Sequence, residues 1–456
     1  MFEFGDTKYN HWFDGQSLLH SFTINKGKIH YRSHYLHSKT FKTNTAANRI
    51  VVSEFGTLAY PDPRKTLLQR MKATLQMLSP NYEPSDNNNF NLYPLGDDIV
   101  VAQESNIIHI IDPITLDTKD RINLSKYVAI NGATGHPHIE ADGTVYNLAT
   151  TFKMRPKTCV IMLPSNGDIS GQATATQRKG KIICTLPVKR EQPAYFNIPL
   201  ILGSRMFGKA GRKIKPVFTD KEEEVCFHIV EKKTGQELEL RFVTESFFTF
   251  HHINAYEDNG HVVVDLCCTT DDSYCNFGFF DSSASFIPDE RRQSVRRYVL
   301  PLNTSTKNLV TLNYSCATAI LQDDGSIYCQ YEILSPIAFE YPRINYPVCN
   351  GKQYRFVYGV AGLDKLVKLD TREKTVKMWA EKACFPSEPV FVSRPLADRE
   401  DDGVILSAVI DTELGHHPFL LVLDSITMSE IGRAEFKEVK FPKDLHGIFL
   451  RNIPVC

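Results

Sequence analysis

The chain has 456 residues, and its 52 basic and 53 acidic residues leave a formal net charge of −1. This balance gives no electrostatic reason to expect nucleic acid as a partner. The 11 cysteines are scattered without a Cys-x-x-Cys pair, which argues against a secreted disulfide framework and favours reduced thiols. The first residues lack a signal-peptide pattern, and no run approaches the roughly 18 apolar residues of a membrane span. We therefore expect a cytoplasmic protein.

Short runs rich in β-branched residues, each long enough for one strand, recur along the whole chain. In chain order the clearest occupy 49–53, 98–102, 106–111, 261–266, 403–410 and 419–423. The dipeptides Asp142-Gly143, Asn259-Gly260, Asp324-Gly325 and Asp402-Gly403 predict hairpin turns. No long linker divides the sequence, so the pattern predicts a large all-β domain. A propeller is an architecture in which so long a chain forms one unit, because every blade shares the central axis.

One segment carries a helical pattern. Between 65 and 78, the apolar positions 67, 68, 71, 75 and 78 form a stripe beside Lys65, Arg70 and Lys72. Such an amphipathic helix either packs as a cap on the body or lies on a membrane surface. The polar, Asn-rich stretch 80–91 that follows it predicts a loop.

Three of the 15 histidines stand in sequence contexts that suggest a metal site. They are His136 in a His-Pro-His motif, His251 in a His-His pair, and His446 before a glycine. More than a hundred residues separate each from the next, so only a fold such as a ring of blades could bring them together. Neutral imidazoles bind first-row metals well, and an all-histidine site with open positions can accept dioxygen and substrate.

Ten of the other histidines are predicted to be ordinary core or surface residues, since a single histidine near apolar residues is weak evidence for a metal. This group consists of His11, His20, His30, His34, His37, His109, His228, His261, His416 and His417. Three glutamates, Glu104, Glu340 and Glu388, could accept the distal N–H of a metal-bound imidazole and so fix its tautomer. Without further context, each could equally be a solvated or ion-paired carboxylate.

The chain closely resembles the animal carotenoid cleavage oxygenase family, which includes β-carotene-cleaving dioxygenases and a retinoid isomerase. The resemblance rests on motifs that run nearly from end to end. Besides the three histidine motifs, they occupy 11–15, 53–59, 61–63, 265–268, 296–303, 339–346 and 386–391. This resemblance implies one domain over residues 1–456, folded as an all-β, seven-bladed β-propeller with a small helical cap.

The resemblance also implies an Fe(2+) held by four histidines on the propeller axis. Three of them carry over to His136, His251 and His446, and the glutamates that orient them carry over to Glu104, Glu340 and Glu388. His138 and His252, the neighbours of two ligands, are then structural. The partners implied are a carotenoid or retinoid substrate, dioxygen and a peripheral membrane surface such as that of the endoplasmic reticulum.

Two departures from the family pattern stand out. The family's second iron-binding histidine lies in a motif close to His-Ser-Phe-Gly, whereas here Pro193-Ala194-Tyr195-Phe196 is followed by Asn197 and no histidine occurs between His138 and His228. About twenty residues, an inner strand and its neighbour, are expected to be missing after Phe196. Relatives also begin several dozen residues before the position that matches Met1. The domain is therefore predicted to be incomplete in both places, at a cost in buried backbone hydrogen bonds and metal affinity.

The family docks on membranes, and the segment after Pro61-Asp62-Pro63 is the expected point of contact. Some relatives carry a palmitoylated cysteine there, but this chain has Arg64, so contact would rest on the apolar stripe of 65–78.

Three functions stay open at this point. The first is iron-dependent oxidative cleavage of a carotenoid double bond by dioxygen, giving apocarotenoid or retinal carbonyl products. The second is a retinoid isomerohydrolase that acts on all-trans retinyl esters. The third is a catalytically impaired isoform that binds a carotenoid or retinoid. Product analysis separates the first two, and bound pigment without turnover would favour the third.

Overall fold

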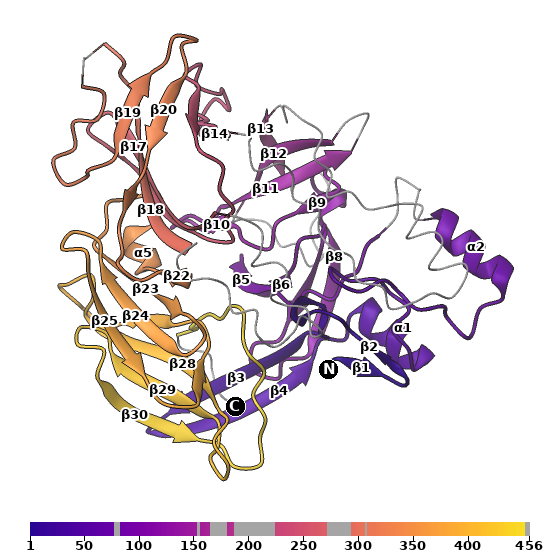
Figure 1. Ribbon diagram of the computed structural model, residues 1–456. Coiled ribbons are helices and arrows are strands. Elements are labelled where there is room, and N and C mark those ends of the chain that lie inside the picture. The colour runs from indigo at the N-terminus through magenta and orange to yellow at the C-terminus, as the bar shows by residue number, and fades with distance from the viewer. Residues whose placement is uncertain are drawn as a thin grey trace.

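The computed structural model describes residues 1–76, 83–152, 156–164, 180–186, 224–270, 293–305 and 308–451 (Figure 1). These residues form mostly strands with few helices, as the sequence predicts. Two helices lie near the N-terminus, α1 (Lys39–Ala47) and α2 (Leu67–Gln76), and the short α5 (Tyr346–Cys349) follows β22. Two 3-10 turns, η1 (Trp12–Asp14) and η2 (Leu124–Lys126), complete the helical elements described.

The strands are grouped into sheets that follow one another around the molecule (Figure 1). The first half of the chain contributes a ribbon of β1 (Glu3–Phe4) and β2 (Thr7–Lys8), and a hairpin of β3 (Leu18–Asn25) and β4 (Lys28–Tyr35). A four-stranded sheet then comprises β5 (Asn91–Leu95), β6 (Asp98–Ala102), β7 (Ile107–Ile111) and β8 (Thr118–Asn123). The next comprises β9 (Gly132–Ala133), β10 (His138–Ile139), β11 (Val145–Phe152), β12 (Pro156–Leu163) and β13 (Lys181–Leu186).

The second half of the chain contributes four more sheets. One contains β14 (Val225–Phe227), β15 (Phe242–Thr244), β19 (Thr318–Leu321) and β20 (Ile327–Gln330). Its neighbour contains β16 (His252–Asp258), β17 (His261–Thr269), β18 (Gln293–Pro301) and β21 (Glu332–Ile333). The third contains β22 (Glu340–Arg343), β23 (Phe356–Ala361), β24 (Lys365–Asp370) and β25 (Thr375–Ala380). The last contains β26 (Cys384–Pro386), β27 (Val390–Ser393), β28 (Gly403–Asp411), β29 (Phe419–Asp424) and β30 (Glu430–Glu435).

Most of these sheets are antiparallel meanders, the arrangement of a propeller blade. The order β14-β15-β20-β19 departs from this, because β15 pairs in parallel with β20. That sheet is closed by strands from two distant parts of the sequence, with β16–β18 lying between them in the chain.

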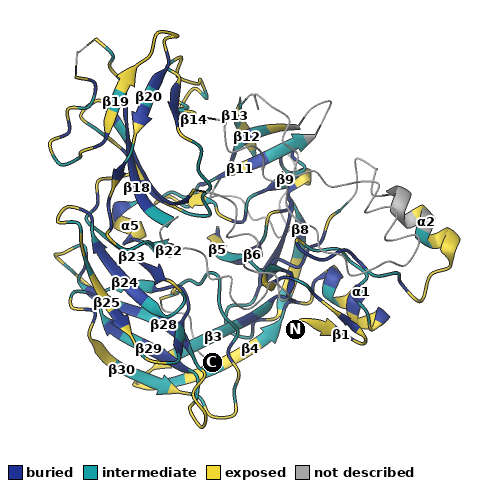
Figure 2. Cartoon of the chain, in the orientation of Figure 1, coloured by how far each residue is buried: buried dark blue, intermediate teal, exposed yellow. Residues whose placement is uncertain are grey.

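The hydrophobic core lies between consecutive sheets rather than at one centre. Val263 of β17 packs in one cluster with Val357 of β23, and Tyr358 of β23 shares another with Ile405 of β28. Buried residues, dark blue in Figure 2, are found along the strands of these sheets. Because blade packing buries the apolar faces this way, the strand ends near the axis remain available for polar side chains.

Most of the predicted turns form. Asn259 and Gly260 join β16 to β17, and both have positive φ (45° and 75°), as a type I′ turn requires. Gly143 and Gly325 also have positive φ. The prediction for Asp402-Gly403 is wrong, because Gly403 is the first residue of β28 and pairs with Ser393. A Cβ there would lie 2.2 Å from the carbonyl oxygen of Val392, so this glycine permits close strand approach.

The predicted helix forms over 67–76, whereas Met77 and Leu78 lie outside the described residues. It begins with a capping box: Thr66 N donates to Gln69 Oε1 (2.9 Å), and Gln69 N donates to Thr66 Oγ1 (3.3 Å). The helix projects from the rim of the molecule, away from the sheets (Figures 1 and 2). Leu67 and Leu68 are 56% and 77% exposed, so these two side chains do not pack on the propeller. None of the helices among the described residues is long and apolar enough to cross a membrane.

Candidate metal centre

The fold brings His136, His251 and His446 together from three distant segments. His136 lies between β9 and β10, His251 directly precedes β16, and His446 lies in the C-terminal segment after β30. The Nε2 atom of His446 is 2.9 Å from Nε2 of His136 and 3.3 Å from Nε2 of His251. Within the described parts of the chain, this cluster contains three histidines.

Carboxylates lie behind the three imidazoles. Glu340 Oε2 is 2.7 Å from Nδ1 of His251, and Glu388 Oε1 is 2.8 Å from Nδ1 of His446. Glu104 Oε1 is 3.4 Å from Nδ1 of His136 and accepts a hydrogen bond from the backbone N–H of Gly135 (3.0 Å). A carboxylate accepts the Nδ1 proton, so each imidazole paired in this way presents an unprotonated Nε2.

This arrangement fits a metal ion. Facing Nε2 lone pairs about 3 Å apart repel one another unless a cation or a proton lies between them. Imidazole nitrogens bind first-row metals at about 2.1 Å, which places two ligands at right angles about 3.0 Å apart. The two measured Nε2 separations lie close to that value. The three histidines therefore form a candidate metal site with room for further ligands.

Burial keeps the deepest of these imidazoles neutral. His446 is nearly buried, and burial lowers its pKa to about 4 even though Glu388 acts in the opposite direction. For Glu388, burial opposes ionisation, but Arg343 and His446 together bring its pKa below the usual value. The result is a neutral imidazole held by an ionised carboxylate, which is the state that binds a metal. Of the three imidazoles, His136 is the most exposed.

Irregularities in two strands orient Glu340 and His251. In β22 the register shifts between Glu340 and Arg343, and Tyr341 within this bulge has a φ of 55°. Such strain at a non-glycine residue is typical of functional sites. Gly359 on the partner strand makes the bulge possible, because a Cβ there would lie 2.3 Å from the Phe339 ring. The register of β16 also shifts, between His252 and Asn254, directly beside His251.

The segment that carries His446 has no regular secondary structure and is held by side chains. Lys443 Nζ donates to the carbonyl of Pro386 (2.6 Å), and Asp444 Oδ1 pairs with Nε2 of His20 (2.7 Å). Arg343 Nη2 donates to the carbonyl of Gly447 (3.0 Å). These contacts fix the segment between β3 and β22.

The structure also places the histidines assigned other roles. His138 Nδ1 is 3.3 Å from the hydroxyl of Tyr346, outside the cluster. His228 pairs with Glu237 at 2.5 Å on an exposed edge. The position after Phe196, where the family has its second iron-binding histidine, lies outside the described residues.

Two residues of the site were missed by sequence reasoning. The ring of Tyr341 lies 5.3 Å from that of His251 and 5.9 Å from that of His446, and Arg343 lies 3.6 Å from Glu388. Both belong to the same motif as Glu340, so their sequence position was the signal that could have found them.

An aromatic wall leads from the surface to the histidines. The Phe250 ring is 6.4 Å from that of His251 and 6.3 Å from that of Phe13. Phe13 in turn contacts Phe90 at 5.6 Å and the partly exposed Phe55 at 5.9 Å. These rings present an apolar surface beside the histidines, which suits contact with an apolar ligand.

Comparisons with known proteins agree on one family. A family model described as retinal pigment epithelial membrane protein matches residues 1–451. The chain is 39% identical to the β,β-carotene 15,15'-dioxygenase of Gallus gallus over 483 aligned positions, covering 99% of this chain and 91% of the relative. It is 38% identical to the human mitochondrial carotenoid-cleaving dioxygenase, covering 98% of this chain and 84% of the relative.

Solved structures show the same fold. A variant of the Synechocystis apocarotenoid oxygenase superimposes with a TM-score of 0.72 at 19% identity, covering 98% of this chain and 89% of the other. A chimera of that enzyme with the retinal pigment epithelial protein gives 0.73 at 19% identity, with coverages of 99% and 91%.

Proposed function

Because this chain belongs to the carotenoid oxygenase family, we propose that it oxidatively cleaves a carotenoid double bond at an Fe(II) held by His136, His251 and His446. The observation that carries the proposal is the convergence of three Nε2 lone pairs at the inner end of an aromatic wall. When bound, Fe(II) supplies the dioxygen chemistry that splits the polyene into two carbonyl products.

The chain's own residues supply position and environment. Glu340 and Glu388 hold the Nδ1 protons of His251 and His446, which keeps both Nε2 atoms free for the metal. The rings of Phe13 and Phe250 orient an apolar polyene and exclude water along its length. No side chain has to act as a general acid or base in this reaction.

Two alternatives stay open. The resemblance to a retinoid isomerase keeps a retinoid isomerohydrolase acting on all-trans retinyl esters as the first alternative. The missing His-Ser-Phe-Gly motif favours an impaired, ligand-binding isoform. The alignment with the chicken enzyme spans 483 positions, more than the 456 residues of this chain, which supports an internal gap.

Iron content tests the proposal first. We would measure iron in the purified chain beside a version with a His-Ser-Phe-Gly strand inserted after Phe196. Near-stoichiometric iron in the chain itself, lost in His446→Ala but kept in the control His228→Ala, supports a three-histidine centre. Iron in the restored version alone would assign the activity to the longer parent. In an iron-loaded sample, apocarotenoid aldehydes support cleavage, whereas 11-cis or 13-cis retinol from a retinyl ester supports isomerisation.

We also propose that the protein is cytoplasmic and docks peripherally on a membrane such as the endoplasmic reticulum, where a lipid-soluble substrate dissolves. The exposed Leu67 and Leu68 on α2 support this proposal. A projecting helix with exposed leucine side chains can insert them into the interfacial layer of a membrane.

A further inference from the structure

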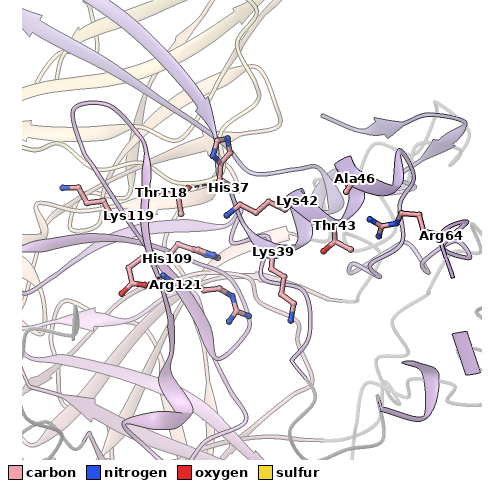
Figure 3. Close-up of a pocket in the computed structure, with 11 residues that line it drawn as sticks. His37, Lys39, Lys42, Thr43, Ala46, Arg64, His109, Thr118, Lys119 and Arg121 are labelled. Atoms are coloured by element: carbon pink, nitrogen blue, oxygen red, sulfur yellow. Dashed lines mark hydrogen bonds between the residues drawn. The ribbon is translucent and has the colours of Figure 1, made fainter. Parts of the chain in front are cut away.

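A cavity of about 620 Å³ lies between α1 and the strands β7 and β8 (Figure 3). It shares no residue with the candidate metal centre. Its wall carries five cationic side chains, Lys39, Lys42, Arg64, Lys119 and Arg121, against one acidic residue, Asp120. An opening with this lining attracts anions.

Acidic neighbours hold most of these cations in place. Arg121 donates to Asp86 (2.7 Å) and Glu83 (2.9 Å), and Lys39 lies 3.6 Å from the same glutamate. Arg64 binds Asp62 through two nitrogens, and Lys119 lies 3.0 Å from Asp112. These partners neutralise much of the charge. The ammonium group of Lys42 alone among the five has no hydrogen-bond or ion-pair partner within the described residues, and Lys42 is an exposed residue.

The N-terminus of α1 does not contribute to anion binding. Asp86 accepts the backbone N–H groups of Lys39 (3.1 Å) and Thr40 (2.8 Å), so the free donors of the first turn are already used. An anion in the cavity would therefore be held by side chains on the exposed face of α1, chiefly Lys42 and the neighbouring hydroxyl of Thr43.

His109 places an unused hydrogen-bond acceptor in the wall of the cavity. Its Nδ1 is 3.0 Å from Asn88 Oδ1, and the side-chain Nδ2 of Asn88 donates to the carbonyl of Ile107 (2.7 Å). Nδ1 of His109 must then be the donor, which leaves a lone pair on Nε2. This Nε2 atom is buried and lies 3.7 Å from Oδ2 of Asp86, too far for a hydrogen bond. It has no hydrogen-bond partner among the described residues, and the residue is 1% exposed. An orphaned buried acceptor is rare and indicates a missing donor.

We propose that this cavity binds a phosphorylated polyol, with the phosphate at Lys42 and Thr43 and a hydroxyl group donating toward His109. Cations and a hydroxyl recognise phosphate oxygens, while a neutral imidazole acceptor recognises an O–H group. Arg64 and Lys39 add further donors at the same opening (Figure 3). This chemistry is shared by soluble sugar-alcohol phosphates and by the head group of phosphatidylinositol.

Calorimetric titration of the purified chain tests the proposal with inositol 1-phosphate, inorganic phosphate and free inositol as separate probes. We expect inositol 1-phosphate to bind more tightly than either fragment. Lys42→Ala should weaken it by about tenfold or more, the scale of a charge-assisted hydrogen bond, and Thr43→Val by a smaller factor. Lys28→Ala, which removes an exposed lysine at the distant β3–β4 turn, is the matched control and should bind normally.

Three results would overturn the proposal: no measurable heat with inositol 1-phosphate, equal affinity for inorganic phosphate, or an unchanged affinity in Lys42→Ala. Vesicle flotation then identifies the source of the ligand. A Leu67→Ser/Leu68→Ser background removes the proposed docking through α2, so the two proposals can fail separately. In that background, stronger binding to phosphatidylinositol vesicles than to phosphatidylserine vesicles of equal charge would identify the ligand as a lipid head group. Binding of inositol 1-phosphate without that lipid preference would identify the ligand as a free polyol phosphate.

Discussion

Glu388 binds the imidazole of His446 and the backbone beside it at the same time. One carboxylate oxygen lies 2.8 Å from Nδ1 of His446, and the other accepts the N–H of Gly447 at 3.0 Å. A single buried side chain therefore fixes both the tautomer of the imidazole and the path of the segment that carries it.

Glu388→Gln should weaken metal binding by about 10–100-fold, the usual cost of losing a carboxylate partner of a ligand histidine. The amide preserves the shape but removes the charge that stabilises the Nδ1–H donor. A chelator competition titration measures the affinity. Glu239→Gln, an exposed glutamate in the loop before β15, is the matched control. Equal affinities in the two variants would contradict this role for Glu388.

Leu67→Ser/Leu68→Ser should abolish most binding to lipid vesicles. Burying one leucine side chain contributes about 1.5–3 kcal/mol, so each substitution should cost about tenfold or more in partitioning. Flotation with neutral phosphatidylcholine vesicles measures the effect without a charge contribution. Leu396→Ser and Leu414→Ser remove two leucines that are each 99% exposed elsewhere. If these controls lose as much binding, α2 is not the docking element.

Arg297→Met should destabilise the protein by about 3–5 kcal/mol, because it leaves the buried Asp265 without its countercharge. Arg297 donates to both carboxylate oxygens, at 2.8 and 2.7 Å, and Tyr354 adds a third hydrogen bond at 2.7 Å. Urea unfolding gives the change in the free energy of unfolding. Arg355→Met breaks a more exposed pair with Asp370 and should cost no more than about 1 kcal/mol. Similar losses in both variants would show that burial does not decide the effect.

His109 should make the protein less stable in mild acid. Burial lowers its pKa from 6.5 to about 4, so below pH 6.5 the unfolded chain binds a proton that the native state does not. Neutral His109 does not reduce the free energy of unfolding above pH 6.5. As the pH drops toward 4, its effect lowers the free energy of unfolding by about 3 kcal/mol. The shift in melting temperature between pH 7 and pH 5 should therefore be smaller in His109→Gln than in the parent chain. An equal shift would mean that His109 is protonated as readily in the native state as in the unfolded one.

Local sequence patterns predicted the secondary structure but not which polar side chains are buried. The Asn-rich stretch 80–91 was predicted to be a loop. Residues 83–90 have no regular structure, whereas Asn91 begins β5. Residues 85–88 are nevertheless buried, and Asp86 and Asn88 hold α1 and His109. Burial of these polar side chains depends on donors and acceptors from other segments, which no local pattern reveals.

The sequence by itself determined most strands, most hairpin turns, the helix at 67–76 and the family, because these depend on local residue patterns and on motifs. The strand predicted at 49–53 is wrong, because these residues follow α1 without regular structure. It also indicated the three histidines and three glutamates. Only the tertiary structure decided that His136 and His446, separated by 310 positions, lie 2.9 Å apart through their Nε2 atoms. Tertiary packing also decided that Glu104 lies farther from its imidazole than Glu340 and Glu388 do. The physical reason is that these distances depend on how whole sheets pack and where strands bulge, and such long-range contacts are not encoded in any one stretch of sequence.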